Sequence, residues 1–119
     1  MNIQRHGTTA RYSDIVIHNG TAWIVEVPAS EDADAATQTR EILASLDRLL
    51  AQAGSARDRL LSATIYLTDM ADYDAMNAAW DAWLPAGTAP SRACVQVAAL
   101  ARPGWRVEIA LVAAASPRN

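Results

Sequence analysis

The alternation of apolar and polar residues predicts a β-hairpin near the start of the chain. Two short runs rich in Ile, Val and Trp, residues 13–18 and 21–27, are separated by an Asn-Gly pair at residues 19–20. Both central residues of a type I′ turn need positive φ angles, which Asn and Gly adopt most readily, so these runs are expected to pair. Pro28 ends the second run because proline has no amide hydrogen for the strand ladder. A short additional strand has room to form around residues 2–5.

Two longer segments repeat apolar residues at the spacing of an amphipathic helix. Across residues 33–53, Ile and Leu recur three or four positions apart, and Gly54 follows where a C-cap glycine is favoured. A second helix opens near Asp72 and carries Tyr, Met and Trp at helical intervals up to Leu84, a stripe that we interpret as core. Between the helices, residues 60–68 alternate like a strand with one packed face.

The end of the chain is predicted to contain two more strands, residues 91–100 and 105–113, joined through a Pro-Gly turn. Almost every interior position is apolar, yet the first run carries Arg92 and the second carries Glu108. In a hairpin that turns tightly about residues 102 and 103, directly opposed residues are one even-numbered and one odd-numbered, whereas residues 92 and 108 are both even-numbered. The two side chains would therefore point to different faces of the sheet. They could then meet only through a bulge or across a subunit boundary.

The order of these elements predicts an α+β fold in which two helices pack on one face of a mixed β-sheet. We expect one domain spanning residues 1–119, because a chain of this length has no room for a second core. The face of the sheet without helices is left open and largely apolar, and such a face usually becomes a subunit interface. A homo-oligomer is therefore expected.

Composition and charge argue against several classes of function. The net charge of −3 and the few, scattered basic residues do not favour nucleic-acid binding. The single cysteine, Cys94, excludes an intramolecular disulfide and favours a cytoplasmic location, and no Cys/His cluster has the spacing of a metal site. No apolar run approaches the roughly 20 residues of a membrane helix, so no membrane insertion is expected.

Four residues are candidates for chemistry, each beside a plainer interpretation. The guanidinium of Arg92 could bind a small carboxylate through paired hydrogen bonds, or pair with an acid at the sheet rim. Glu108 could orient water with a pKa raised by burial, or simply face solvent. Cys94 is expected to be a small buried hydrophobe whose backbone could line a pocket. Tyr12 could close a pocket, although packing is slightly favoured.

Four short motifs resemble those of the reactive intermediate deaminase family, the RidA/YjgF group. Residues 90–97 (PSRACVQV) and 107–109 (VEI) resemble its C-terminal signature. Residues 63–69 (ATIYLTD) and 76–80 (MNAAW) are similar to the strand and second helix that precede that signature. The resemblance implies a chorismate-mutase-like fold assembled as a homotrimer with clefts between subunits. It also implies hydrolysis of reactive enamine or imine intermediates, such as 2-iminopropanoate, to 2-oxo acids and ammonia, without a cofactor.

The resemblance also implies roles for particular residues. Arg92 matches the family arginine that binds the substrate carboxylate, Cys94 the cysteine whose backbone lines the pocket, and Glu108 the glutamate that positions water. Tyr12 falls near the family's pocket tyrosine. At residues 25–26 the chain has Val-Glu where the family has a small residue followed by Gly, and a bulkier, acidic lining would oppose an anionic substrate. The alternative is a non-catalytic module on the same scaffold that binds a small carboxylate or a protein.

Overall fold

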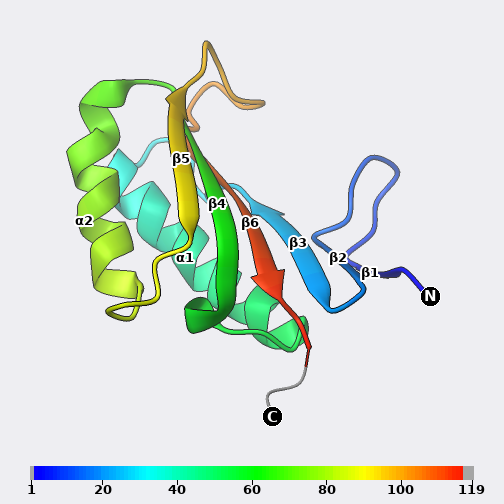
Figure 1. Ribbon diagram of the computed structural model, residues 1–119. Coiled ribbons are helices and arrows are strands. Elements are labelled where there is room, and N and C mark those ends of the chain that lie inside the picture. The colour runs from blue at the N-terminus through cyan, green and yellow to red at the C-terminus, as the bar shows by residue number, and fades with distance from the viewer. Residues whose placement is uncertain (1, 117–119) are drawn as a thin grey trace.

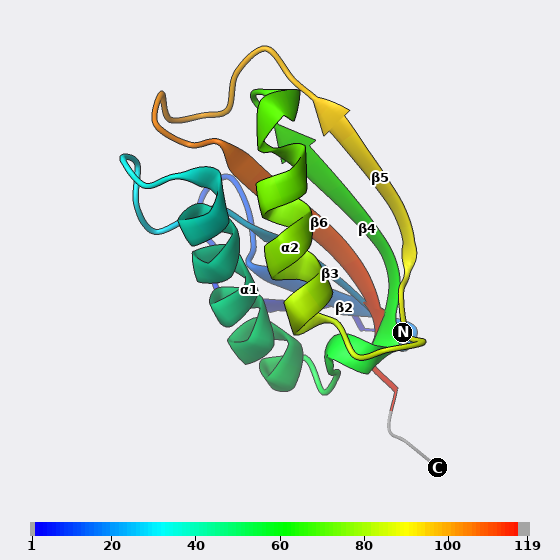
Figure 2. The ribbon, with the colours of Figure 1, turned by 90° about the vertical axis from the view of Figure 1, so that its left-hand side faces the viewer.

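A single mixed β-sheet carries both α-helices on one of its faces (Figures 1 and 2). The computed structural model describes residues 2–116. The strand order is β1-β2-β3-β6-β4-β5. The strands are β1 (Gln4–His6), β2 (Ile15–His18), β3 (Thr21–Glu26), β4 (Leu60–Leu67), β5 (Ser91–Gln96) and β6 (Val107–Ala114). The helices are α1 (Ala35–Gln52) and α2 (Tyr73–Trp83), with short 3-10 turns η1 (Arg57–Arg59) and η2 (Met70–Asp72). The predicted α+β class is therefore confirmed.

The hairpin near the start of the chain forms as its turn chemistry predicts. Asn19 and Gly20 have φ angles of 52° and 73°, the left-handed conformation that this turn requires. β2 and β3 pair antiparallel on either side of it. The short additional strand is also present as β1, slightly later than expected, and it pairs with β2.

The core lies between the sheet and the two helices. Helix α1 begins after Asp34, whose Oδ1 accepts a hydrogen bond of 2.8 Å from the Thr37 amide. Its apolar stripe is buried against the sheet, as the spacing predicts. The aromatic stripe of α2 is also buried at Trp80 and Trp83, whose rings lie 5.6 Å apart, so its interpretation as core is confirmed.

The last two strands do not form the expected hairpin, and that prediction is wrong. β6 lies in the middle of the sheet, antiparallel to both β3 and β4, whereas β5 lies at the edge and runs parallel to β4. The parallel neighbours β4 and β5 are joined by residues 68–90, a crossover that contains α2, because a parallel pair needs a longer connection than a tight turn allows. Residues 97–106 join β5 to β6 past the intervening β4. The Pro-Gly signal marks a turn inside this second connection, where the Trp105 amide donates to the Arg102 carbonyl at 3.1 Å.

The face of the sheet away from the helices is open. It exposes large apolar side chains at Trp23, Val25 and Val95, between 42% and 47% accessible. Cross-strand pairing places Val25, Ala110, Thr64 and Ala93 in one row across this face. The open, largely apolar face expected from the sequence is therefore present.

Candidate functional site

Arg92 occupies the helix-covered side of the edge strand β5, in register with the buried Ala63 of β4. Its guanidinium lies 5.7 Å from the centre of the Trp80 ring and 5.9 Å from that of Tyr73, and Nη2 donates to the Tyr73 hydroxyl at 3.4 Å. Aromatic faces attract a cation without neutralising it. In the described part of the chain no carboxylate pairs with this guanidinium. The cation is therefore held in place yet unneutralised.

A shallow cavity of about 320 Å³ opens beside Arg92. Its lining also includes Asn77, Trp80 and Asp81 from α2, together with Ala89 and Pro90 from the segment that leads into β5, and Asp81 forms no ion pair with Arg92. The plainer interpretation of Arg92, an arginine paired with an acid at the sheet rim, does not describe this environment. A carboxylate-bearing ligand entering this cavity would meet a positioned guanidinium.

Cys94 lies on the same face of β5 as Arg92, in register with Ile65 of β4. Its side chain is half-buried and packs against the core. Burial raises the pKa of the Cys94 thiol, and the nearby charge of Arg92 opposes this only in part. The thiol therefore stays protonated and uncharged at neutral pH, which agrees with the interpretation of Cys94 as a small hydrophobic residue.

Glu108 points to the opposite, open face of the sheet. It lies on β6 between the fully buried Val107 and Ile109, in register with Tyr66 of β4. Partial burial raises the pKa of the Glu108 carboxyl, because removing water disfavours its charged form. The expected direction of this shift is confirmed.

A second cavity, of about 420 Å³, contains Glu108. It is lined largely by apolar groups from three parts of the chain, and its lining comprises Tyr12, Ser13, Asp14, Val25, Glu26, Val27, Ala101, Trp105 and Glu108. The structure thus brings Tyr12 and Glu108 to the same cavity, although they are far apart in sequence.

Tyr12 reaches this cavity from the loop between β1 and β2. The loop is closed by a hydrogen bond of 2.7 Å from the Thr9 amide to the Tyr12 carbonyl, and by one of 3.2 Å from the Tyr12 amide to Thr9 Oγ1. The Tyr12 side chain is 62% exposed, so it does not pack in the core as the sequence slightly favoured. It stands at the rim of the cavity.

Arg92 and Glu108 lie on opposite faces of the sheet, as the parity argument predicted, although the hairpin on which that argument rested is absent. The strand between them is β4, which pairs with β5 through Ala63 and with β6 through Tyr66. A sheet separates the two side chains within one chain. The two candidate residues therefore belong to two half-sites.

Val25 and Glu26, the pair that departs from the deaminase pattern, point in opposite directions. Val25 lies on the open face, 47% exposed, at the cavity that contains Glu108. The Glu26 carboxylate instead accepts hydrogen bonds of 2.5 Å from Ser45 Oγ on α1 and of 3.0 Å from the Val27 amide. Glu26 nevertheless contributes to the lining of the same cavity, so its opposition to an anionic substrate and the narrowing of the cavity by Val25 both stay predictions.

Sequence reasoning missed two side chains of this cavity, Asp14 and Trp105. Asp14 carries no signal in the sequence, because nothing in the order of residues shows that the loop between β1 and β2 folds toward β6. Trp105 lies between the Pro-Gly turn and β6, three residues before Glu108. This short distance in sequence from a candidate residue was the one signal that could have indicated its place in the cavity.

Residues 2–116 contain neither a candidate metal site nor a candidate membrane-spanning helix. No group of His, Cys, Asp and Glu side chains in this range has the arrangement of a metal site. Within the same range, no helix combines the length and apolar character needed to cross a bilayer.

The fold agrees with that of a known class of proteins. A family model described as Endoribonuclease L-PSP matches residues 2–115. This match covers nearly the whole chain, and the chain belongs to this family.

Particular relatives refine the assignment. The RutC family protein YoaB of Escherichia coli (strain K12) is 50% identical over 114 residues, covering 96% of this chain and 99% of the relative. A RutC family protein of Haemophilus ducreyi is 44% identical over 113 residues, covering 94% and 96% respectively. The crystal structure of NMB1025 from Neisseria meningitidis, a member of the YjgF protein family, matches with a TM-score of 0.93 and 48% identity, covering 100% of this chain and 98% of that one. The resemblance to the YjgF group is confirmed.

Proposed function

We propose that the protein hydrolyses reactive enamine or imine intermediates of the 2-iminopropanoate type to 2-oxo acids and ammonia. The observation that carries the proposal is the environment of Arg92, a cation held over two aromatic rings that forms no ion pair among the described residues, beside a cavity whose lining also includes Asp81. Such a group suits a small substrate carboxylate. Glu108, in a separate and largely apolar cavity, provides a carboxylate suited to proton transfer.

The reaction needs little beyond binding and orientation. Water adds to the electrophilic carbon of the protonated imine, forming a C–O bond as the C=N double bond becomes a C–N single bond, and Glu108 accepts a proton from that water. Glu108 then returns this proton to the nitrogen of the resulting carbinolamine. The C–N bond breaks and ammonia leaves, while the hydroxyl group gives its proton to solvent water as the C=O bond forms. Arg92 holds the carboxylate throughout, so most of the acceleration comes from proximity. The raised pKa of Glu108 makes it a stronger base than an ordinary surface glutamate.

The proposed site is completed between copies of the chain, in a homotrimer. Arg92 and Glu108 lie on opposite faces of one sheet, so within one chain they cannot reach the same small substrate. The open apolar face supports an interface that brings the Glu108 cavity of one copy to the Arg92 strand of the next. Cys94 would then line the pocket through its backbone, and Tyr12 would stand at its rim.

Formation of pyruvate from 2-iminopropanoate generated in situ tests the activity. The wild-type protein should accelerate pyruvate release, while Arg92→Ala and Glu108→Gln should lose most of that acceleration. Arg40→Ala is the matched control, because Arg40 is an exposed arginine on α1 whose side chain, within residues 2–116, hydrogen-bonds locally to Thr37. No acceleration by the wild type, or full acceleration by folded Arg92→Ala, would refute the mechanism.

Mixing the two inactive variants tests the position of the site. In an equal, random mixture of Arg92→Ala and Glu108→Gln subunits, about a quarter of the interfaces join an intact Arg92 to an intact Glu108. About a quarter of the wild-type activity should therefore return after co-refolding. If each site lay within one chain, the mixture would stay inactive.

A second candidate is a binding module without turnover. Val25, exposed at the cavity that contains Glu108, favours it, because a bulky side chain there leaves less room for a substrate and its attacking water. Calorimetry with pyruvate and other small 2-oxo acids separates the two functions. Tight binding by a protein that produces no pyruvate from the imine would support the module.

Cleavage of RNA, which the description of the matching family mentions, is less well supported. The chain has 10 basic and 13 acidic residues, a balance that does not favour binding to a phosphate backbone. A fluorescent single-stranded RNA included as a second substrate should remain intact under the conditions in which pyruvate forms.

A further inference from the structure

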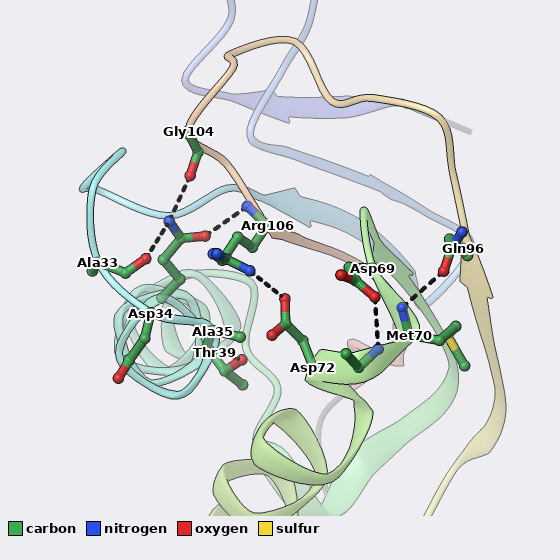
Figure 3. Close-up of polar contacts among 12 residues, drawn as sticks. Ala33, Asp34, Ala35, Thr39, Asp69, Met70, Asp72, Gln96, Gly104 and Arg106 are labelled. Atoms are coloured by element: carbon green, nitrogen blue, oxygen red, sulfur yellow. Dashed lines mark hydrogen bonds and ion pairs between the residues drawn. The ribbon is translucent and has the colours of Figure 1, made fainter.

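A buried glutamine joins helix α1 to the connection between the two half-sites. Gln38 is 0% exposed, and its amide makes three hydrogen bonds. Nε2 donates to the Ala33 carbonyl at 3.2 Å and to the Gly104 carbonyl at 2.8 Å, and Oε1 accepts from the Arg106 amide at 2.8 Å. Dashed lines in Figure 3 mark these three bonds. Both donor hydrogens and the acceptor of the amide are used, a combination that neither a carboxylate nor an apolar side chain reproduces.

Two further contacts fix the same end of the connection. The backbone of Gly104 packs so closely on Glu31 that a Cβ atom at this position would lie 2.0 Å from the Glu31 carbonyl oxygen. Arg106 Nη1 forms an ion pair of 2.9 Å with Asp72 Oδ2, also visible in Figure 3. The end of residues 97–106 is thereby clamped to the start of α1 and to η2.

The clamped segment forms one wall of the cavity that contains Glu108. Gly104 and Arg106, the two residues bonded by Gln38, flank Trp105 directly, and Trp105 lines that cavity. β6 begins immediately afterwards, so Glu108 follows Arg106 by only two positions. The position of Gln38 therefore sets both the Trp105 wall and the first residues of the strand that carries Glu108.

Thr39 shows that burial of a polar group on α1 does not by itself create this link. It is also 0% exposed, but its hydroxyl donates to the Ala35 carbonyl within the helix, at 2.7 Å. Loss of the Thr39 hydroxyl removes a buried hydrogen bond without touching residues 97–106. Thr39→Val is therefore a matched control for the general cost of losing a buried hydrogen bond.

We propose that Gln38 is a positioning residue for the reaction, which acts by holding the Trp105 wall against the cavity that contains Glu108. Its kinetic consequence rests on the deaminase function proposed above. Its structural consequence does not, because the geometry of Trp105 and the solvent access of Glu108 can be measured without any substrate.

The first test follows two resonances in the full-length protein by NMR. In Gln38→Leu the Trp105 indole signal, assigned with Trp105→Phe, should shift or broaden. The titration midpoint of the Glu108 carboxyl should fall toward its ordinary value, because water reaches the cavity. The other ionisable side chains around this cavity are Asp14, Glu26 and Tyr12. Thr39→Val should leave both signals of interest unchanged.

The second test separates kcat from KM with 2-iminopropanoate. Gln38→Leu should lower kcat on the order of tenfold, since small displacements of a reacting group are costly. It should leave KM nearly unchanged, because the Arg92 half-site does not contact Gln38. The acid limb of the pH profile should move to lower pH, whereas Thr39→Val should alter neither kcat nor this limb.

Each outcome has a defined meaning. Unchanged Trp105 and Glu108 signals in a folded Gln38→Leu would overturn the positioning role, whether or not the protein is a deaminase. If the Trp105 and Glu108 signals change in Gln38→Leu but the wild-type protein does not turn over 2-iminopropanoate, the positioning role of Gln38 stands and only the proposed deaminase function is refuted. If Gln38→Leu does not fold, Gln38→Asn serves in its place, since it keeps an amide but is one methylene too short to reach Gly104 and Arg106.

Discussion

At the scale of single residues, the neighbours of Glu108 on β6 are fully buried while its own side chain is only half-buried. Such a position favours the protonated form of the carboxyl, and the pKa is raised from its ordinary value of 4.5 for this reason. A group with a raised folded-state pKa contributes stability that is complete below its ordinary pKa. That contribution is lost as the pH rises through the raised value.

Glu108→Gln should therefore make the protein more stable than the wild type at about pH 7, where the native carboxylate is ionised in a poorly hydrated place. The difference should vanish below about pH 4, where the glutamic acid is neutral in both states. Urea denaturation midpoints at the two pH values check this. A Glu108→Gln protein that is less stable than the wild type at neutral pH would mean that the carboxylate makes a favourable contact in the native state.

Asp34 behaves in the opposite way, because it caps α1. The hydrogen bond from the Thr37 amide lowers the pKa of the Asp34 carboxyl from its ordinary value of 3.8. Its contribution to stability is therefore present above that ordinary value and is lost as the pH falls through the lowered one. Asp34→Ala should lower the thermal midpoint at neutral pH, with the gap to wild type closing in acid. Asp34→Asn, which keeps the cap, should lose much less.

At the scale of elements, the connection between β5 and β6 depends on a close backbone approach. Gly104→Ala should destabilise the protein by about 1–3 kcal/mol, because the new methyl group collides with the backbone of Glu31. Gly87→Ala is the matched control. Gly87 has a φ of +80° and nothing within 4 Å of the added atom, so it shows only the conformational cost, about 1 kcal/mol.

Guanidinium chloride midpoints of the two glycine variants provide the comparison. An equal or smaller loss for Gly104→Ala would mean that the segment around Glu31 yields to the methyl group without strain. In that case the connection would be held by Gln38 and the Arg106–Asp72 ion pair alone.

Elements with a local signal were predictable from the sequence, whereas their arrangement in the sheet was not. The turn at Asn19 and Gly20 is specified by the conformational freedom of those two residues, and it formed as expected. The prediction that β5 pairs with β6 was wrong, because an apolar run does not show which strand becomes its neighbour. In the sheet, β4 lies between β5 and β6, although it comes before both of them in the sequence.

The candidate site divides in the same way. The types of Arg92 and Glu108, two charges in apolar strands, were visible in the sequence, and alternation placed them on different faces. The direction of the Glu26 side chain could not be predicted, because it depends on a hydrogen bond from Ser45. Nothing in the sequence shows that this residue of α1 packs next to β3. The contribution of Trp105 to the cavity likewise depends on a connection fixed by Gln38 from another element.

At the scale of the whole molecule, the open face of the sheet needs a partner. Trp23, Val25 and Val95 are large apolar side chains exposed on this face, and an exposed apolar patch often marks an interaction surface. We expect the protein to associate through this face. Its mass in solution should be a multiple of 12.8 kDa, and three times that value for the proposed homotrimer.

Trp23→Glu should shift the protein toward the monomer, because the charge would lie unpaired in the interface. Met70→Glu is the control, since Met70 is 40% exposed but belongs to η2 and not to the open face. Light scattering coupled to size-exclusion chromatography measures both. A wild-type monomer would leave the open face without a partner and would rule out a site completed between chains.

The central place of β6 also affects how the protein is made. β6 is translated after all the other strands, yet it separates β3 from β4 and pairs with both. Until it has left the ribosome, β3 and β4 each have an unpaired edge, and unpaired edges promote aggregation. The nascent chain is therefore prone to aggregation until β6 has been synthesised. We expect chaperones that shield exposed strand edges to improve its folding yield most during that interval.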